Sequence, residues 1–169
     1  MKNVIFIFFL IWSGHAFCLD LEPANSVLGV LWNSSEAEAM KILGSPNGYF
    51  HATKHKKLVF YGKSVVLLFK RGKLKGFRYY EACCRALYQM PVSINSKYSK
   101  EPISLDGVKL SGSSFQNLNR SLSYELGPPD YRAEIATDEV TIRLGFTGSG
   151  YPGKAEEFHF RSIEVDYDL

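Results

Sequence analysis

Cysteine is scarce in this chain, with 3 among 169 residues, and two of them are the neighbours Cys83 and Cys84. Two adjacent cysteines with no other ligands nearby do not support a zinc site. On a strand, alternation places one side chain in the core and the other outside. The alternative is a strained, reducible disulfide between the neighbours, or a bridge between subunits. The sequence leaves the oxidation state of the pair open.

Motifs for catalysis are also lacking. No G-x-S-x-G nucleophile turn is present, and neither neighbouring cysteine has a credible base beside it. His51 and His55 have the spacing of helical metal ligands, but Gly48 and a strand expected from Leu58 predict a loop there. The glycine-rich residues 145–150 follow a strand without opening a helix, so they make no phosphate-binding turn. We therefore expect a protein that is not an enzyme and uses no cofactor or metal.

Long hydrophobic runs are limited to residues 4–12, which follow the positive charge of Lys2. Small residues come next, with Gly14 and Ala16 in a G-x-A arrangement. This is the layout of a secretory signal peptide, and the run is about half of the roughly twenty residues that a transmembrane helix needs. We expect cleavage near residues 16–18 and a periplasmic or secreted protein.

Cys18 allows a second interpretation of the same segment. Its place after the apolar run suits the acylated cysteine of a bacterial lipoprotein. Phe17, however, is bulkier than the small residue that such signals carry before the cysteine. The sequence leaves lipidation of Cys18 open.

The remaining composition is that of a folded globular protein. Hydrophobic residues make up 46% of the chain, charged residues 22% and aromatic residues 14%. These proportions exclude a disordered chain and a polytopic membrane protein. The length fits one ordinary domain or two very small ones. A net charge of +3 is too small to indicate nucleic acid as the partner.

A repeated pattern organises the chain after the apolar run. Residues 29–46 read GVLWNSSEAEAMKILGSP, and residues 107–129 read GVKLSGSSFQNLNRSLSYELGPP. Both begin with Gly-Val, pass through a pair of serines and end in Leu-Gly-x-Pro. Two unrelated amphipathic helices with ordinary caps give a similar pattern. Because strand-rich sequence follows both copies, we favour a duplication.

Each copy predicts a helix with defined ends. Ser35 lies three residues before Glu38, which is the spacing of a capping box. In the second copy, leucines at every fourth position of residues 118–126 predict one buried stripe on a single helix. Gly44 and Gly127 supply the left-handed residue that ends a helix, and a proline two positions on prevents its continuation.

Strand patterns follow the first helix. Residues 58–61 and 64–69 are apolar and rich in β-branched side chains, so the second run is expected to be buried on both faces. A polar hairpin turn at residues 70–73 leads into a partner strand at residues 74–80.

The second half ends in two strands. Residues 140–146 alternate strictly between apolar and polar, as in a strand with one wet face. The apolar parity of the last strand changes after Phe160. A β-bulge near Arg161 or Ser162 restores a single buried face.

These elements predict an α+β fold of two tandem helix plus antiparallel β-sheet units. The boundaries are residues 1–18 for the signal peptide, 19–90 for the first unit, 91–103 for a polar linker and 104–169 for the second unit. Residues 81–90 fit either an extension of the preceding strand or a short helix.

The repeated pattern resembles that of two known families. The segment SEAEAMKILGSP at residues 35–46, with strands after it, is similar to outer-membrane assembly lipoproteins of the SmpA/OmlA type. Two such units in tandem resemble the β-lactamase inhibitor proteins, whose fold pairs a helix-loop-helix with a four-stranded sheet, twice. The chain lacks the disulfide that the inhibitor family has in each unit, and the assembly lipoproteins have one unit. The resemblance implies an exported protein-binding module.

Charge is distributed unevenly along the chain. Residues 21–90 hold eleven Lys and Arg against four Asp and Glu, a net charge of about +7, whereas residues 91–169 hold eight against twelve, about −4. Much of the positive charge lies between Lys54 and Arg78, around the first hairpin. A solvated surface explains such a run. The functional interpretation is steering toward an acidic protein surface, an anionic lipid or a cell-wall polymer.

We therefore expect a non-catalytic protein-binding module, an inhibitor or immunity-type protein that blocks a partner enzyme by stoichiometric binding. The alternative is an envelope structural or assembly factor that docks to an outer-membrane complex or anionic lipid through its basic first unit. The expected partner is another protein with an acidic surface and not a nucleic acid. Contact with a membrane is at most peripheral, and the oligomeric state is open.

Aromatic and arginine anchors dominate protein interfaces, and they guide the choice of candidate residues. Alternation along a strand buries one of each neighbouring pair, so a core role is the competing interpretation for half of them. The candidate partner-binding residues are Tyr49, Phe50, Lys70, Arg71, Lys73, Phe77, Arg78, Tyr79, Tyr80 and Tyr151.

Overall fold

The structure is a computed structural model that describes residues 18–81, 98, 102–148 and 154–167. The apolar run of the expected signal peptide, the pair Cys83 and Cys84, and most of the expected linker lie outside the described residues. In the described ranges, no helix has the length and apolar character needed to cross a membrane.

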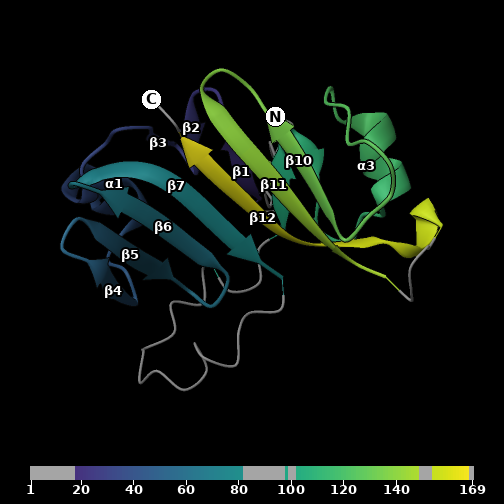
Figure 1. The fold of residues 1–169 in the computed structure, drawn as a ribbon. Coiled ribbons are helices and arrows are strands. Elements are labelled where there is room, and N and C mark those ends of the chain that lie inside the picture. Colours follow the sequence, from purple (N-terminus) through teal and green to yellow (C-terminus); the bar gives the residue numbers. More distant parts are fainter. Residues whose placement is uncertain (1–17, 82–97, 99–101, 149–153, 168–169) are drawn as a thin grey trace, which may run out of the picture.

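The larger of two sheets has seven antiparallel strands in the order β10-β11-β12-β7-β6-β5-β4. Each half of the chain contributes one meander, and the two meanders meet where β7 pairs with β12 (Figure 1). At this junction Phe77 lies opposite Val165, and Tyr79 lies opposite Ile163. The strands are β4 (Gly48–Thr53), β5 (Lys56–Tyr61), β6 (Val65–Lys70), β7 (Lys73–Tyr80), β10 (Arg132–Ala136), β11 (Val140–Thr147) and β12 (His159–Tyr167).

The smaller sheet has five short strands in the order β3-β2-β1-β8-β9, and it lies behind the larger sheet in Figure 1. Its halves meet where β1 pairs with β8 in parallel, with Leu19 opposite Ile103. Both sheets therefore contain strands from both halves of the chain. The strands are β1 (Leu19–Glu22), β2 (Ser26–Val27), β3 (Val30–Leu31), β8 (Ile103–Leu105) and β9 (Val108–Lys109).

Helix α1 (Glu36–Leu43) confirms the predicted caps. The hydroxyl of Ser35 accepts from the backbone N–H of Glu38 at 3.3 Å, and the backbone N–H of Ser35 donates to the Glu38 carboxylate at 2.7 Å. The capping box thus satisfies two of the backbone donors that lack a helical partner at the start of the helix. The helix ends at Gly44, whose φ of 84° is in the left-handed region that a side chain disfavours.

Helix α3 (Phe115–Ser121) is shorter than predicted, because it ends well before Gly127. Leu122 is extended, and the backbone N–H of Leu126 bonds to the Asn119 side chain rather than to a helical carbonyl. Leu118, Leu122 and Leu126 are all buried, although they do not share one helix. Serine and tyrosine near the end of α3 are weak helix formers, so tertiary burial of the leucines decides the chain path. A short 3-10 helix, η2 (Ala155–Glu157), contacts α3.

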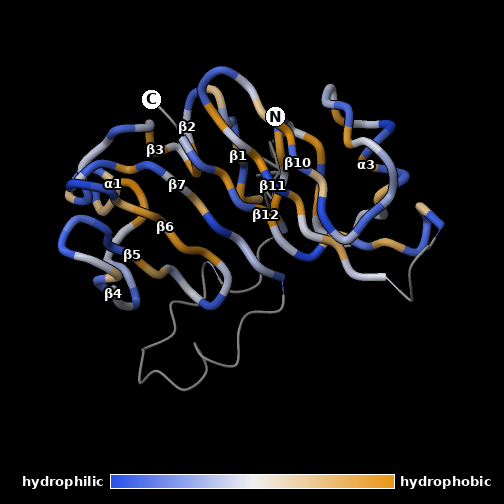
Figure 2. The backbone as a smooth tube through the Cα atoms, in the orientation of Figure 1, coloured by the Kyte–Doolittle hydropathy of each residue, from blue (hydrophilic) through white to orange (hydrophobic). Residues whose placement is uncertain are grey.

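A single hydrophobic core lies between the two sheets and includes side chains of both helices. Figure 2 shows hydrophobic colour along the strands and hydrophilic colour at most turns. Aromatic contacts tie the two halves together in this core. The rings of Trp32 and Tyr167 stack with centres 5.3 Å apart, and those of Tyr79 and Phe160 stack 6.4 Å apart. Aromatic pairs add stability beyond the area they bury.

The predicted α+β fold of two tandem helix plus sheet units is wrong. The protein is mostly β, with two α-helices in the described residues, and its strands form two sheets that both halves share. Strands β7 and β12, which come from the two halves of the chain, pair with each other instead of remaining exposed edges. This pairing satisfies backbone groups that would otherwise face solvent or another chain.

Two finer strand predictions are confirmed. Strand β11 alternates between buried and partly exposed residues along its length. Gly145 pairs with Ser162 and Phe146 pairs with Phe160, so Arg161 is the extra residue of a β-bulge. The bulge returns the apolar residues of β12 to the core face.

We predict that Phe77→Ala lowers the free energy of unfolding by about 3–5 kcal/mol, because the Phe77 ring is fully buried at the junction of the two meanders. Urea unfolding followed by tryptophan fluorescence measures this loss. The matched control is Phe50→Ala, which removes the same side chain at a half-exposed position and costs less than about 1 kcal/mol. Equal losses for the two variants contradict the packing described here.

Candidate anion-binding cleft

Two turns lie beside each other at one end of the larger sheet and build a cleft. In the β6–β7 turn, Arg71 and Gly72 have φ values of 51° and 78°. Two consecutive left-handed residues match the twist of the flanking strands of a hairpin. The backbone N–H of Arg71 donates to the carbonyl of His55, in the β4–β5 turn, at 2.8 Å. This hydrogen bond joins the two turns, so the side chains of both line one cleft.

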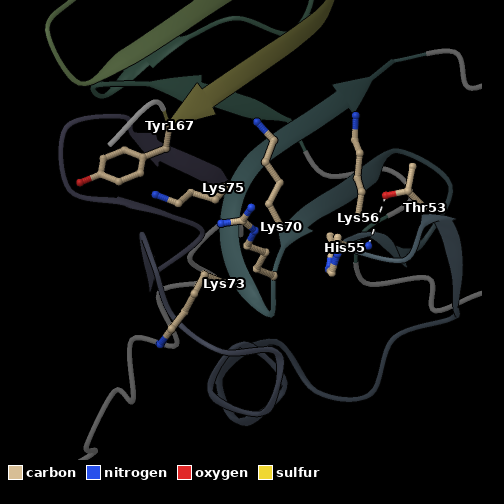
Figure 3. A pocket seen from close by; sticks show the side chains of 8 residues that line it. Thr53, His55, Lys56, Lys70, Lys73, Lys75 and Tyr167 are labelled. Carbon is tan, nitrogen blue, oxygen red and sulfur yellow. Dashed lines mark hydrogen bonds between the residues drawn. The ribbon is translucent and has the colours of Figure 1, made fainter.

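The cleft has a volume of about 650 Å³ and is open to solvent (Figure 3). One side comes from the end of β4 and the β4–β5 turn, and the other from the β6–β7 hairpin. The last residue of β12 adds an aromatic ring beside the hairpin. The lining residues are Thr53, His55, Lys56, Lys70, Arg71, Lys73, Lys75 and Tyr167.

The charge of the cleft has one sign. Six of the eight lining residues are Lys, Arg or His, and none is Asp or Glu. In the part of the chain that the structure describes, none of these six has a carboxylate within the 4.0 Å of an ion pair. The ammonium of Lys75 lies 4.8 Å from the centre of the Tyr167 ring. That contact holds the side chain without neutralising its charge.

Glu38 of helix α1 interacts electrostatically with Lys73 of the cleft. Hydrogen bonds from the backbone and hydroxyl of Ser35 are the main reasons that the pKa of Glu38 is lowered, and the charge of Lys73 adds to them. Because Glu38 is bound to the helix cap, it does not enter the cleft lining.

On the outer face of the larger sheet, by contrast, the arginines are neutralised. Arg78 of β7 lies 2.7 Å from Asp166 and 3.5 Å from Glu164, both on β12. Arg143 of β11 lies 2.8 Å from Asp166 and 2.7 Å from Glu134 of β10. This ladder of ion pairs crosses four strands. The excess positive charge of the first half is therefore left at the cleft.

The ladder changes the pKa of its central carboxylate. Burial by itself raises the pKa of Asp166, but the hydrogen bonds and charges of Arg78 and then Arg143 outweigh burial and lower it. The hydrogen bond from Arg143 to Glu134 raises the pKa of the arginine further. Both groups stay charged over the physiological range.

Five of the sequence candidates are exposed on the first half. Lys70, Arg71 and Lys73 line the cleft. Tyr49 and Phe50 lie on β4, with 62% and 49% of their surface exposed. Because Thr53, at the end of β4, also lines the cleft, strand β4 leads into it.

The other candidates have different surroundings. Phe77 and Tyr79 are buried and belong to the hydrophobic core. Arg78 belongs to the ion-pair ladder, and the hydroxyl of Tyr80 donates to Glu164 at 3.1 Å. Tyr151 lies outside the described residues.

Sequence reasoning did not select five residues of the cleft: Thr53, His55, Lys56, Lys75 and Tyr167. The density of lysines around the first hairpin was a usable signal for two of them. No local signal pointed to Tyr167, because only the pairing of β12 with β7 places it beside Lys75.

His51 lies on strand β4, not in the loop that the sequence predicted, and its ring contacts that of Tyr49. Among the described residues, no three His, Cys, Asp or Glu side chains are grouped so that they could hold a metal ion.

The cleft is open and rich in cations, so its side chains have the chemistry to bind carboxylates or phosphates.

Comparisons with known proteins add no identification. No protein-family model, curated protein or solved structure matched the chain.

We predict that Asp166→Asn lowers the free energy of unfolding at pH 7 by about 1–3 kcal/mol, because it leaves two partly buried arginines without their shared carboxylate. The pKa of Asp166 is lower in the folded than in the unfolded protein, so its contribution is full above about pH 4 and is lost as the pH falls through the folded-state value. The difference from the wild type should shrink at pH 3.

Urea unfolding at pH 7 and pH 3 tests this dependence. The control Asp138→Asn changes an exposed turn carboxylate and should have little effect at either pH. A loss for Asp166→Asn that is the same at both pH values contradicts the ladder.

Proposed function

We propose that this protein is an exported, non-catalytic binding protein of inhibitor or immunity type, which blocks a partner enzyme by stoichiometric binding to an acidic surface. The observation that carries the proposal is the cleft of about 650 Å³ with six basic residues and no acidic residue in its lining. Like charges at this density repel one another, so they cost stability unless an anion joins them. A partner carboxylate cluster supplies that anion.

The exposed aromatic side chains beside the cleft support a protein as the partner. Tyr49 and Phe50 lie on the strand that leads into the cleft, and both are exposed. Aromatic anchors surrounded by complementary charge are typical of protein interfaces. Lysine charges increase the association rate, while aromatic packing slows dissociation.

The alternative function is that of an envelope assembly factor that docks to anionic lipid through the same cations. The open shape of the cleft and its lysines also suit phosphate headgroups. Binding to lipid through lysines alone falls steeply as salt rises, whereas a complex with aromatic anchors persists.

We predict that the double charge reversal Lys70→Glu with Lys73→Glu weakens binding to poly-L-glutamate by about tenfold or more, since two attractive contacts become repulsive. Fluorescence anisotropy with labelled poly-L-glutamate measures the dissociation constant at two salt concentrations. Vesicles of phosphatidylcholine and anionic phosphatidylglycerol are the second probe.

The matched control is Lys109→Glu with Lys154→Glu, which changes the net charge equally at exposed positions outside the cleft. This control should bind poly-L-glutamate within about twofold of the wild type. Equal weakening by both double variants contradicts the cleft as the binding site. Binding to the vesicles without binding to poly-L-glutamate contradicts the protein-partner proposal and favours the lipid alternative.

A further inference from the structure

The two sheets formed by the described residues have four edges, and three of them are protected. Strands β3 and β9 are the edges of the smaller sheet, and each has only two residues. Strand β10, at one edge of the larger sheet, buries Ala133 and Ile135 and presents the charged Arg132 and Glu134 on its other face. Short strands and charged side chains are the usual means by which proteins prevent pairing at an edge.

Strand β4, the fourth edge, lacks these protections. Its six residues include no Lys, Glu, Asp, Arg or Pro, and the last five are exposed. Tyr49 and Phe50 are neighbours, so their side chains point to opposite faces of the sheet, yet both are exposed. Strand β4 therefore buries little on either face. In the described ranges, β4 pairs only with β5, so the backbone groups on its other side have no strand partner there.

Basic residues surround this open edge. Lys54 and His55 form the turn after β4, and Lys56 follows as the first residue of β5. The ammonium of Lys57 lies 4.3 Å from the centre of the Tyr49 ring. It also forms an ion pair with the carboxylate of Glu36 at 2.7 Å, so Lys57 is not a free cation. An extended chain placed along β4 thus passes an aromatic residue on each face and ends at the basic cleft.

We propose that β4 is a docking edge, where an extended acidic segment of the partner protein adds to the larger sheet as an eighth strand. Backbone hydrogen bonds supply the affinity in this mode, and alternate side chains supply the specificity. Apolar residues of the segment pack on Phe50 or Tyr49, and its carboxylates reach His55, Lys56 and the cleft. This inference rests on the proposed function and names the form in which the partner's acidic surface is presented.

A second copy of this chain fits the edge less well. Antiparallel pairing of two β4 strands places the basic turn of each copy beside the start of the other copy's β4, and residues 44–53 contain no Asp or Glu. A second copy thus offers no opposite charge to the cations of the turn and the cleft. An acidic segment meets the same cations with opposite charge, so charge complementarity selects the partner protein.

The test uses the full chain and a six-residue peptide that alternates glutamate and valine, with the same peptide carrying lysine in place of glutamate as the charge control. Hydrogen exchange read residue by residue is the measurement. Strand addition predicts that alternate backbone amides of β4 exchange at least about tenfold more slowly with saturating glutamate–valine peptide. The lysine peptide should leave these amides unchanged.

A pair of variants tests the aromatic contacts. Tyr49→Ala with Phe50→Ala should weaken peptide binding by about tenfold, whereas Leu31→Ala with Tyr131→Ala, which removes two exposed apolar side chains elsewhere, should change it less than about twofold. Peptide binding that depends on Lys70 and Lys73 but leaves the β4 amides unprotected overturns strand addition and leaves the proposed function standing. Protection of β4 without peptide, together with a dimer mass in solution, overturns it in favour of a second copy.

Discussion

The antiparallel pairing of β7 with β12 is the constraint on which the rest of the structure depends. It joins a four-stranded meander of the first half to a three-stranded meander of the second half. One face of the junction is apolar, with Phe77 opposite Val165 in the core. The other face is charged, with Arg78 between Glu164 and Asp166. Burial on one face and paired charge on the other fix the register, since a shift by one residue reverses both faces.

The same junction determines where the free charge lies. Acidic residues of the second half meet arginines on the outer face, and they neutralise Arg78 and Arg143 there. The lysines of the first hairpin lie beyond the reach of those acids, at the end of the sheet. Tyr167 lies over Lys75 because β12 runs beside β7. A small net charge of +3 thus conceals a sheet with one neutral region and one strongly basic end.

Features that depend on near neighbours in the sequence were predictable. The capping box of Ser35 and Glu38 and the bulge at Arg161 follow from local spacing and side-chain parity, and both are present. The end of α3 was not predictable from leucine spacing, because those leucines are buried with or without a helix between them. A buried stripe of leucines alone does not distinguish one long helix from a short helix followed by extended chain.

Features that depend on contacts between residues far apart in the chain could not be predicted from the sequence. No local pattern shows that β7 pairs with β12 or that β1 pairs with β8 in parallel, so the number of sheets and their shared strands were missed. Strand β4 has no alternation to reveal it, because both of its faces are exposed. The basic side of the cleft was visible as a run of lysines around Lys70, but its aromatic wall at Tyr167 depends on the same long-range pairing.

Nuclear Overhauser contacts between the backbone protons of β7 and β12 test the central pairing most directly. The structure predicts contacts across the pairs Tyr80 with Ser162 and Arg78 with Glu164, and slow amide exchange in both strands. Absence of these contacts, with β7 and β12 both exchanging rapidly as exposed edges, would show that the two meanders form separate sheets and contradict the account.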